Sequence, residues 1–295
     1  MDPGWYWFGV ILAILSGVVN NYGTLLQKKV VNKYRDDDKF MRSLAKNPIW
    51  LFGLILQMVV GGLLFFIAQM YIGPTLIPGL MAAGLIVLAV GSVRLLGEQL
   101  NISEIIGIIL MIGAIALIGF SNMAIDLADQ DFLDSALLIR ISLFTGVLFG
   151  GSAILYILYL KRIMRGISLA IFSGLMFALS NFWVSPLMGV LTAIFSGTFV
   201  LTELLIFIFS LILLAITNYL GIVTIQKSLR EGQVSNLIPI QQVPIQIAPP
   251  FYYLIVFLLP IPNIYSLIFL ISGVALVIVS SFLLGKRQAQ IETLK

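Results

Sequence analysis

The sequence predicts an all-α membrane protein with nine transmembrane helices, arranged as two inverted four-helix repeats joined by a linker helix. Composition is the first reason: 60% of the 295 residues are hydrophobic and only 10% are charged, against roughly 45–50% and about 25% in soluble domains. The apolar residues also form long continuous runs, without the alternation that β-barrel strands require. An apolar excess of this size is expected to face a lipid bilayer.

Nine segments have the length of a membrane-spanning helix, which needs about 20 mostly apolar residues. The boundaries are least distinct over 188–203, where Ser196-Gly197-Thr198 interrupts the apolar run. Met1-Asp2-Pro3-Gly4 lacks the basic region of a cleavable signal, so the first run is expected to remain a span. The predicted spans are residues 5–27, 48–71, 75–96, 102–121, 136–160, 167–188, 203–227, 234–258 and 264–285.

The charges in the loops predict how these spans are oriented. Sixteen of the 17 Lys and Arg residues fall in loops on one side of the predicted membrane, and Arg140 alone falls on the other. An excess of Lys and Arg in short loops marks the cytoplasmic side. We therefore expect an outer N-terminus and a cytoplasmic C-terminus, in the plasma (inner) membrane.

Missing residue types exclude several classes of function. The chain has no cysteine and no histidine, which removes disulfides, thiolate metal sites and the commonest catalytic base. Its positive charges lie in short loops and form no basic face, so nucleic acid is not an expected partner. The middle of every span lacks ionisable residues, so we expect neither an intramembrane enzyme nor a cofactor.

An internal repeat is indicated by three short matches that occur in the same order. The matched pairs are Leu12–Gly17 with Leu169–Gly174, Leu76–Pro78 with Leu237–Pro239, and Gly107–Ala114 with Leu267–Val274. The fifth span supplies the extra crossing that turns the second unit upside down, a plan that recurs in secondary transporters. The predicted divisions are a first repeat (1–121), an acidic outer loop with the linker helix (122–165), a second repeat (166–285) and a cytoplasmic tail (286–295).

Several of these segments resemble a known family. Leu96-Gly97-Glu98-Gln99-Leu100, followed by Gly107 and Gly113, resembles the EamA-type signature of the drug/metabolite transporter superfamily. Nine spans, Gln27-Lys28-Lys29 at the end of the first span, and Thr217-Asn218-Tyr219-Leu220 in the seventh are closer to its NIPA-type magnesium transporter branch. The resemblance implies a secondary transporter, whose partners are the lipid bilayer and a small-molecule or cation substrate.

Two departures from related patterns limit what the resemblance implies. The second repeat has Leu258-Leu259-Pro260 where the first repeat has its glutamate. The first span also resembles that of small multidrug resistance proteins, but it has no carboxylate near Gly17, where their proton-coupling glutamate would fall. Proton-coupled export of cations by that mechanism is therefore not supported.

Neutral polar side chains inside the spans are the candidate substrate-binding residues. Amides in a helix bundle commonly hydrogen-bond between helices, and that remains the alternative for each one. The predicted eighth span favours a site, because it combines three glutamines with Pro239 and Pro244, which loosen the helix. Pro244 removes the backbone bond to Ile240 and frees a carbonyl. The candidates are Asn20, Asn21, Asn181, Asn218, Gln241, Gln242 and Gln246.

A second group of residues is predicted to anchor or gate the bundle. Arg94 and Glu98 lie four positions apart at the cytoplasmic end of the third span, where they can pair on one helix face. Anchoring is the favoured role for this pair, and a cytoplasmic gate is the alternative. Pro78, Pro239 and Pro244 loosen the helices near the starts of the third and eighth spans.

Two substrate hypotheses follow from these residues. Amide groups both donate and accept hydrogen bonds, which favours a small uncharged or zwitterionic solute moved by alternating access. Magnesium or another divalent cation is the alternative, because it prefers oxygen ligands and keeps several waters. A carboxylate within reach of the glutamines would favour the ion. A non-transporting receptor or scaffold is the third hypothesis.

Overall fold

The computed structural model describes residues 3–35, 37, 39–72, 80–121, 123 and 130–293, and every regular element in this part of the chain is a helix. The predicted all-α class is therefore confirmed. Elements η1 and η2 are single π-helical turns. In chain order the elements are α1 (Pro3–Lys33), α2 (Phe40–Ala45), α3 (Pro48–Ile55), η1 (Leu56–Val60), α4 (Gly61–Ile72), α6 (Gly84–Leu96), α7 (Ile102–Phe120), α8 (Ser135–Leu160), α9 (Arg165–Ser196), α10 (Leu201–Glu231), α11 (Val234–Phe251), η2 (Tyr252–Val256) and α12 (Ile264–Thr293).

Within the described residues, seven helical stretches are long and apolar enough to cross a membrane. They coincide with the predicted spans except those over 75–96 and 234–258. The first exception falls on α6, which has 13 residues and follows a segment outside the described part. The second falls on α11 and η2, because four prolines and three glutamines among the 18 residues of α11 lower its hydropathy. The nine-span count and the inverted repeat remain predictions.

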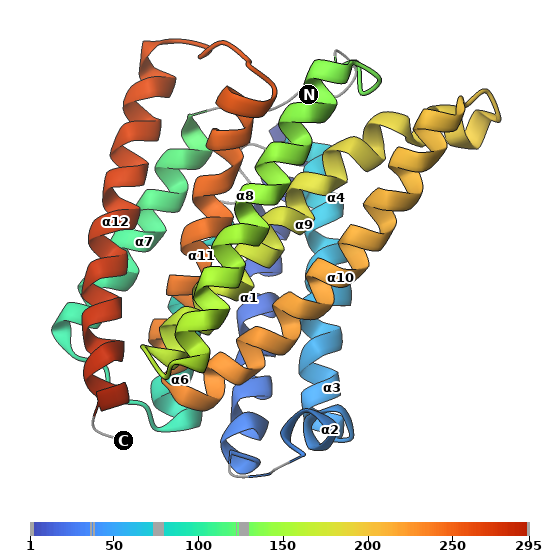
Figure 1. Cartoon of the computed structure of the whole chain (residues 1–295). Helices are drawn as coiled ribbons and strands as arrows, with labels where there is room; N and C mark the ends of the chain where they lie inside the picture. Colours follow the sequence, from blue (N-terminus) through green and yellow to red (C-terminus); the bar gives the residue numbers. More distant parts are fainter. Residues whose placement is uncertain are drawn as a thin grey trace.

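The α9–α10 pair changes one predicted boundary. α9 continues past residue 188 to Ser196, with Pro186 inside it, and Gly197 ends it with a φ of 73°. Glycine adopts this left-handed backbone without the strain that a Cβ atom causes. α10 begins four residues later, so the two long helices form a hairpin that leans away from α7 and α12 (Figure 1). α12 likewise extends to Thr293, through most of the segment predicted as a tail.

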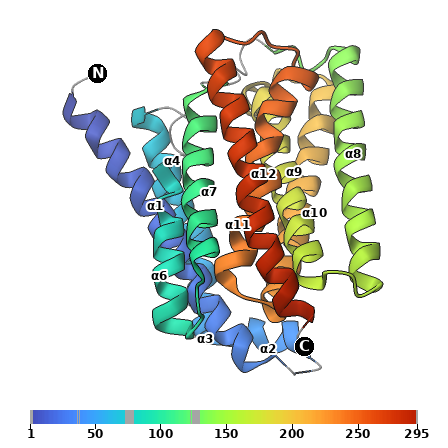
Figure 2. The same cartoon turned by 90° about the vertical axis from the view of Figure 1, so that its left-hand side faces the viewer.

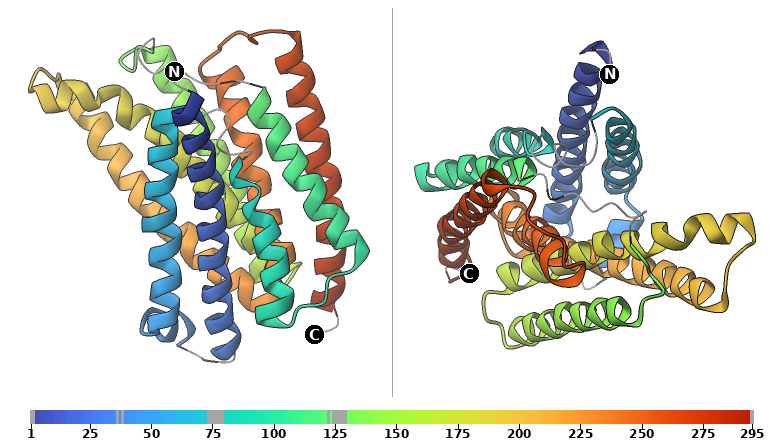
Figure 3. Two further views of the ribbon diagram at one scale, coloured as in Figure 1. Left: turned by 180° about the vertical axis from the view of Figure 1, so that it is seen from behind. Right: turned by 90° about the horizontal axis from the view of Figure 1, so that it is seen from above.

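The helices run side by side along one axis of the bundle (Figure 2). α1 packs against α3, η1, α4 and α6, while α9 packs against α8, α10 and α11, and α7 pairs with α12. Seen from above, α11 lies in the middle of this arrangement (Figure 3). The two ends of the chain lie at opposite ends of the bundle, and the C-terminal one lies at the same end as α2 (Figures 1 and 2). We call this second end, which carries α2 and the turn between α8 and α9, the basic end.

The outward-facing surface is apolar over the length of the helices. On α8, Leu143, Val147 and Ile154 are 65%, 70% and 61% exposed and follow one another at helical spacing. Exposed side chains of this size on successive turns are costly in water and favourable in lipid. The surface therefore confirms an integral membrane protein.

Glycines set the closest helix crossings. A Cβ atom built on Gly17 of α1 would lie closer than 3.0 Å to the backbone of Met81, just before α6, and one on Gly84 of α6 would meet the backbone of Gly17. In the second half, a Cβ atom on Gly174 of α9 would be equally close to the backbone oxygen of Gln241 in α11. Only glycine allows helices to approach this closely.

Candidate functional site

A chain of amide side chains crosses from the first half of the protein to the second. Gln27 of α1 donates from Nε2 to Gln57 Oε1 over 2.7 Å, and Gln226 of α10 donates from Nε2 to Gln27 Oε1 over 2.5 Å. Gln57 makes a longer contact of 3.5 Å to Asn20 Oδ1, and Trp50 Nε1 donates to Gln226 Oε1 over 3.1 Å. We call Asn20, Gln57, Gln27, Gln226 and Trp50 the amide chain.

Local geometry explains how these side chains meet. Asn20 and Gln27 lie seven residues apart in α1, so two helical turns bring them to one face. Gln57 lies in the π-helical turn η1, where the wider turn changes the direction of successive side chains. π turns of this kind occur often at functional positions. Gln57 and Gln226 were missed from the sequence. Gln57 is a lone amide within an apolar run, and Gln226 stands beside Lys227 at the end of the predicted seventh span.

Amides of the second half form three separate pairs. Gln241 Nε2 donates to Ser173 Oγ over 2.8 Å, and Asn218 Nδ2 donates to Ser180 Oγ over 2.6 Å. The third pair lies within α11, where Gln246 Nε2 donates to Gln242 Oε1 over 3.2 Å. Both glutamines of this third pair are only half-buried, although α11 lies in the middle of the bundle (Figure 3).

The seven amides predicted to bind substrate are not joined in one cluster. Asn181 is exposed and has no hydrogen-bond partner among the described residues. Asn21 is buried and donates to its own helix, at the Gly17 carbonyl, over 2.9 Å. The other five fall into the groups just described, which are Asn20 in the amide chain, Asn218 with Ser180, Gln241 with Ser173, and Gln242 with Gln246.

The predicted pairing of Arg94 with Glu98 does not form. α6 ends at Leu96 and Gly97 has a φ of 69°, so Glu98 lies beyond the helix rather than on its face. Arg94 is exposed and makes no ion pair with any described residue. Glu98 instead reaches the start of α11, where its carboxylate accepts bonds from Val234 N (2.8 Å), Ser235 N (3.2 Å) and Ser235 Oγ (2.8 Å).

This contact anchors α6 to α11 by helix capping. The first N–H groups of a helix have no partner within the helix, and a carboxylate there also meets the positive end of the helix dipole. Pro239 and Pro244 are buried inside α11, which stays helical through both. Pro78 lies outside the described residues.

Two further charged residues join the halves at the basic end, and both were missed as site candidates. Lys28 of α1 is 4% exposed, and its Nζ donates to the backbone oxygens of Leu229 and, over 2.5 Å, Gly232 at the end of α10. Glu104 of α7 is completely buried. Its carboxylate accepts from Asn101 N over 2.6 Å and from Asn236 Nδ2 of α11 over 2.7 Å. We call Lys28, Glu98 and Glu104 the clasp residues.

Asn236, which bonds Glu104, has a buried side-chain oxygen that accepts no hydrogen bond from the described residues. Its side chain is completely buried, and its Oδ1 atom has no hydrogen-bond partner among the described residues. A buried polar atom without a partner is costly, so this oxygen is suited to a ligand that attracts oxygen lone pairs. In the described part of the chain, no group of three or more carboxylate, histidine or cysteine side chains could hold a metal ion.

Comparison with known proteins identifies the family. The protein-family model described as "Magnesium transporter NIPA" matches residues 5–290. No curated protein and no solved structure matches the chain. The match covers nearly all of the 295 residues, and it confirms the resemblance inferred from the motifs of the first, third and seventh spans. This integral membrane chain therefore belongs to the NIPA magnesium transporter family, a family of transporters rather than enzymes.

Proposed function

We propose that this chain carries Mg²⁺ across the membrane by alternating access. The family to which the chain belongs supports a cation, and it reverses the order of the two substrate hypotheses drawn from the sequence. The structural observation that carries the proposal is the buried pair of Glu104 and Asn236 on facing helices. The sequence makes a carboxylate within reach of the α11 glutamines the sign of an ion, and Glu104 does not meet that test. It bonds Asn236, five residues before Gln241 in the same helix, while the glutamines bond Ser173 and one another.

The Glu104–Asn236 pair supplies oxygen atoms of the kind that magnesium prefers as ligands. Mg²⁺ prefers oxygen ligands, dehydrates reluctantly and often binds through only one or two carboxylates while it keeps several waters. Glu104 supplies one negative charge in a buried position, where an ionisable group is expected to serve function. The unpartnered Asn236 Oδ1 supplies a neutral oxygen beside it.

The half-buried amides extend this proposed path along the bundle. Gln242 and Gln246 of α11 are half-buried, and so are Asn20 and Gln57, which lie on α1 and η1. Amide oxygens and their waters can hold a hydrated ion in transit without binding it tightly. A small polar solute is the second candidate, because the same amides pair donors with acceptors.

Matched contacts support two inverted four-helix repeats over residues 1–121 and 166–285. Ser16 Oγ donates to Gly61 O over 2.8 Å, and at the corresponding position of the second half Ser173 Oγ donates to Gly221 O over 2.7 Å. The next residue in each half, Gly17 or Gly174, leaves no room for a Cβ atom against a neighbouring backbone. Residues 122–165, which include α8, would then be the linker that inverts the second unit.

In the proposed orientation, the protein lies in the plasma (inner) membrane and its basic end faces the cytoplasm. Nine crossings would place the two ends of the chain at opposite ends of the bundle, where they lie (Figure 2). The two crossings in addition to the seven long apolar helices would be α6 and α11 with η2. The clasp residues all lie at the basic end and join helices of opposite halves. In this conformation they would close the path toward the cytoplasm, so alternating access requires the clasp to open.

Flux of Mg²⁺ into proteoliposomes that contain a magnesium-sensitive dye tests the proposal. We expect entry above that of protein-free vesicles, and a loss of about tenfold or more in Glu104→Gln, because one buried charge interaction with the ion is removed. Glutamine can still accept the bond from Asn101 N, so the cap of α7 survives. The Gln242→Leu/Gln246→Leu variant is expected to lose flux as well.

Two control variants distinguish a specific loss of Mg²⁺ flux from a general loss of folding or stability. Glu203→Gln changes another carboxylate that caps the start of a helix, α10, but that carboxylate is exposed. Asn181→Leu removes an exposed amide that bonds to no described residue. Both controls are expected to stay within about twofold of the native flux, the usual range for surface changes. Equal losses in the Glu104 and Glu203 variants, or no entry by folded native protein, would reject Mg²⁺ transport through this pair.

A further inference from the structure

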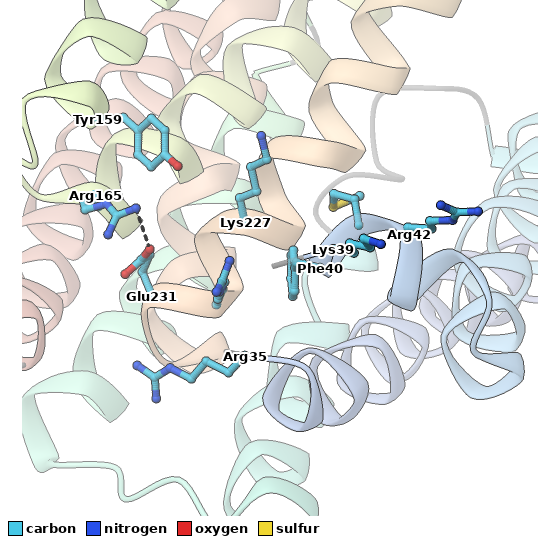
Figure 4. Close-up of a pocket in the computed structure, with 10 residues that line it drawn as sticks. Arg35, Lys39, Phe40, Arg42, Tyr159, Arg165, Lys227 and Glu231 are labelled. Carbon is cyan, nitrogen blue, oxygen red and sulfur yellow. Dashed lines mark ion pairs between the residues drawn. The ribbon is translucent and has the colours of Figure 1, made fainter. Parts of the chain in front are cut away.

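A pocket of about 660 Å³ opens at the basic end, and its lining includes neither the clasp residues nor the amides of the proposed ion path. This volume lies within the roughly 300–1,000 Å³ range of ligand-binding pockets. Its walls come from the turn after α1, from α2, from the ends of α8 and α10 and from the start of α9 (Figure 4). The pocket therefore lies between residues of the first half and residues of the second half.

The lining of this pocket is strongly basic. Among the described residues, Glu231 is the one carboxylate that lines it, and its Oε1 lies 3.3 Å from Arg165 Nη2. Asp37 lies nearby and is held by Ser43 and by the Lys39 backbone, while Asp36 and Asp38 lie outside the described residues. The cations that line the pocket are Arg35, Lys39, Arg42, Arg165, Lys227 and Arg230.

Two of the arginines are held in place by aromatic rings. The Arg230 guanidinium lies 5.0 Å from the centre of the Phe40 ring, and that of Arg165 lies 5.1 Å from the centre of the Tyr159 ring. Cation–π contacts of this length orient a guanidinium before a ligand arrives. Arg165 Nε is buried and has no hydrogen-bond partner among the described residues. A donor in this state lacks the acceptor that a bound anion would provide.

We propose that this pocket binds an anion that carries two or more phosphate groups. Four of the six cations are arginines, whose planar forks match phosphate oxygens in pairs. Because the cations come from several helices, one small anion cannot meet them all, whereas a polyphosphate can. A soluble polyphosphate and a phosphoinositide headgroup share this chemistry. Either ligand would bridge the two halves and stabilise their contact at the basic end.

Binding to the full-length protein tests the proposal independently of transport. Inorganic tripolyphosphate is added to protein in detergent, in buffer without Mg²⁺, and binding is measured by titration calorimetry and by the rise in unfolding temperature that a ligand of the folded state causes. In the second arm, the unfolding temperature is measured in vesicles of phosphatidylcholine with or without phosphatidylinositol bisphosphate. Binding in either arm supports the pocket and identifies the source of the phosphate.

Charge-matched variants locate the binding. Lys227→Gln/Arg230→Gln is expected to weaken binding by about tenfold or more, because two charged partners are lost. Lys161→Gln/Lys286→Gln removes the same charge from exposed positions at the same end and is expected to stay within about twofold. Arg35→Gln/Arg42→Gln serves as a second pocket variant if the first fails to fold. Equal weakening in pocket and control variants, or no binding of either probe, would overturn the proposal.

Discussion

Lys28 is a charged side chain that is almost completely buried, and its position depends on residues far along the chain. Its ammonium group meets the last backbone oxygens of α10, more than 200 positions away, where the helix dipole favours a positive charge. A buried ammonium without such acceptors would be very costly. Opening the basic end therefore requires Lys28 to find other partners, so this residue is expected to control how often the end opens.

We predict that Lys28→Met makes the basic end more accessible. Losing a hydrogen bond from a charged group destabilises the closed state, which shifts the balance between closed and open by about tenfold. The chain has no cysteine, so a single cysteine at buried Thr224 can be labelled with a membrane-impermeant maleimide. The labelling rate from the basic side should rise by about that factor.

Lys29→Met is the control for this prediction, because the neighbouring lysine is exposed. Its variant should label at the native rate. Identical rates in all three proteins would show that Lys28 does not hold the basic end closed.

How far each site residue could be predicted from the sequence depends on how local its contacts are. Asn101 and Glu104 show the spacing of a capping box, which the structure contains, so the position of Glu104 at a helix start was predictable. Its contact with Asn236, 132 residues later, was not. The Arg94–Glu98 pair was predicted from helical spacing alone, and that prediction was wrong because Gly97 ends the helix between them.

At the scale of elements, the crossings of α1 with α6 and of α9 with α11 depend on glycine. Glycine is common in the chain, with 26 residues, so its presence alone does not identify a crossing. Only the structure separates Gly84 and Gly174, which touch a neighbouring backbone, from Gly62 and Gly146, which have open space where a Cβ would be. The proline-rich α11 also fits here, since the Pro244 ring lies where a side chain at position 174 would otherwise be.

We predict that Gly174→Ala is strongly destabilising and that Gly146→Ala is not. The added methyl group at 174 forces α9 and α11 apart, and overpacking of this kind costs about 1–3 kcal/mol. At 146 the same change only improves helix propensity, which is worth about 1 kcal/mol or less. Thermal unfolding in detergent distinguishes the two.

Gly17→Ala extends the test to the first half. If the halves are repeats, it should lower the unfolding temperature about as much as Gly174→Ala does. A stable Gly174→Ala protein would show that this crossing can relax, and a stable Gly17→Ala protein alone would argue against equivalent halves.

At the scale of the whole molecule, the apolar runs predicted nearly all of the helices, because segments that cross lipid must satisfy their backbone hydrogen bonds internally. They did not predict which helices touch, and the amides are the clearest example. Seven amides chosen for their place within spans are divided among several groups, while Gln57 and Gln226 complete a chain that no local pattern revealed. Contacts between Gln27 and Gln226 depend on how the two halves dock.

The α9–α10 hairpin has a consequence for the membrane around the protein. Its helices have 32 and 31 residues, so each is about 46–48 Å long at 1.5 Å per residue, well beyond a hydrocarbon layer of about 30 Å. The tip is apolar, with Phe195 80% and Leu201 71% exposed. Such a hairpin fits within the membrane if it tilts, as it does in Figure 1, or draws a thicker layer of lipid around itself. Otherwise its tip extends into water.

We therefore predict that the stability and the transport rate of this protein depend on the thickness of the bilayer. Thin bilayers should increase the tilt of α9 and α10, strain their contact with α11 and lower the unfolding temperature, since each ångström of mismatch costs a fraction of a kcal/mol. Reconstitution into phosphatidylcholines of increasing acyl-chain length measures this directly, with stability and flux expected to rise together toward the longer chains. A flat response would mean that the exposed tip lies in water, and a peak at intermediate length would give the thickness of membrane that the hairpin fits.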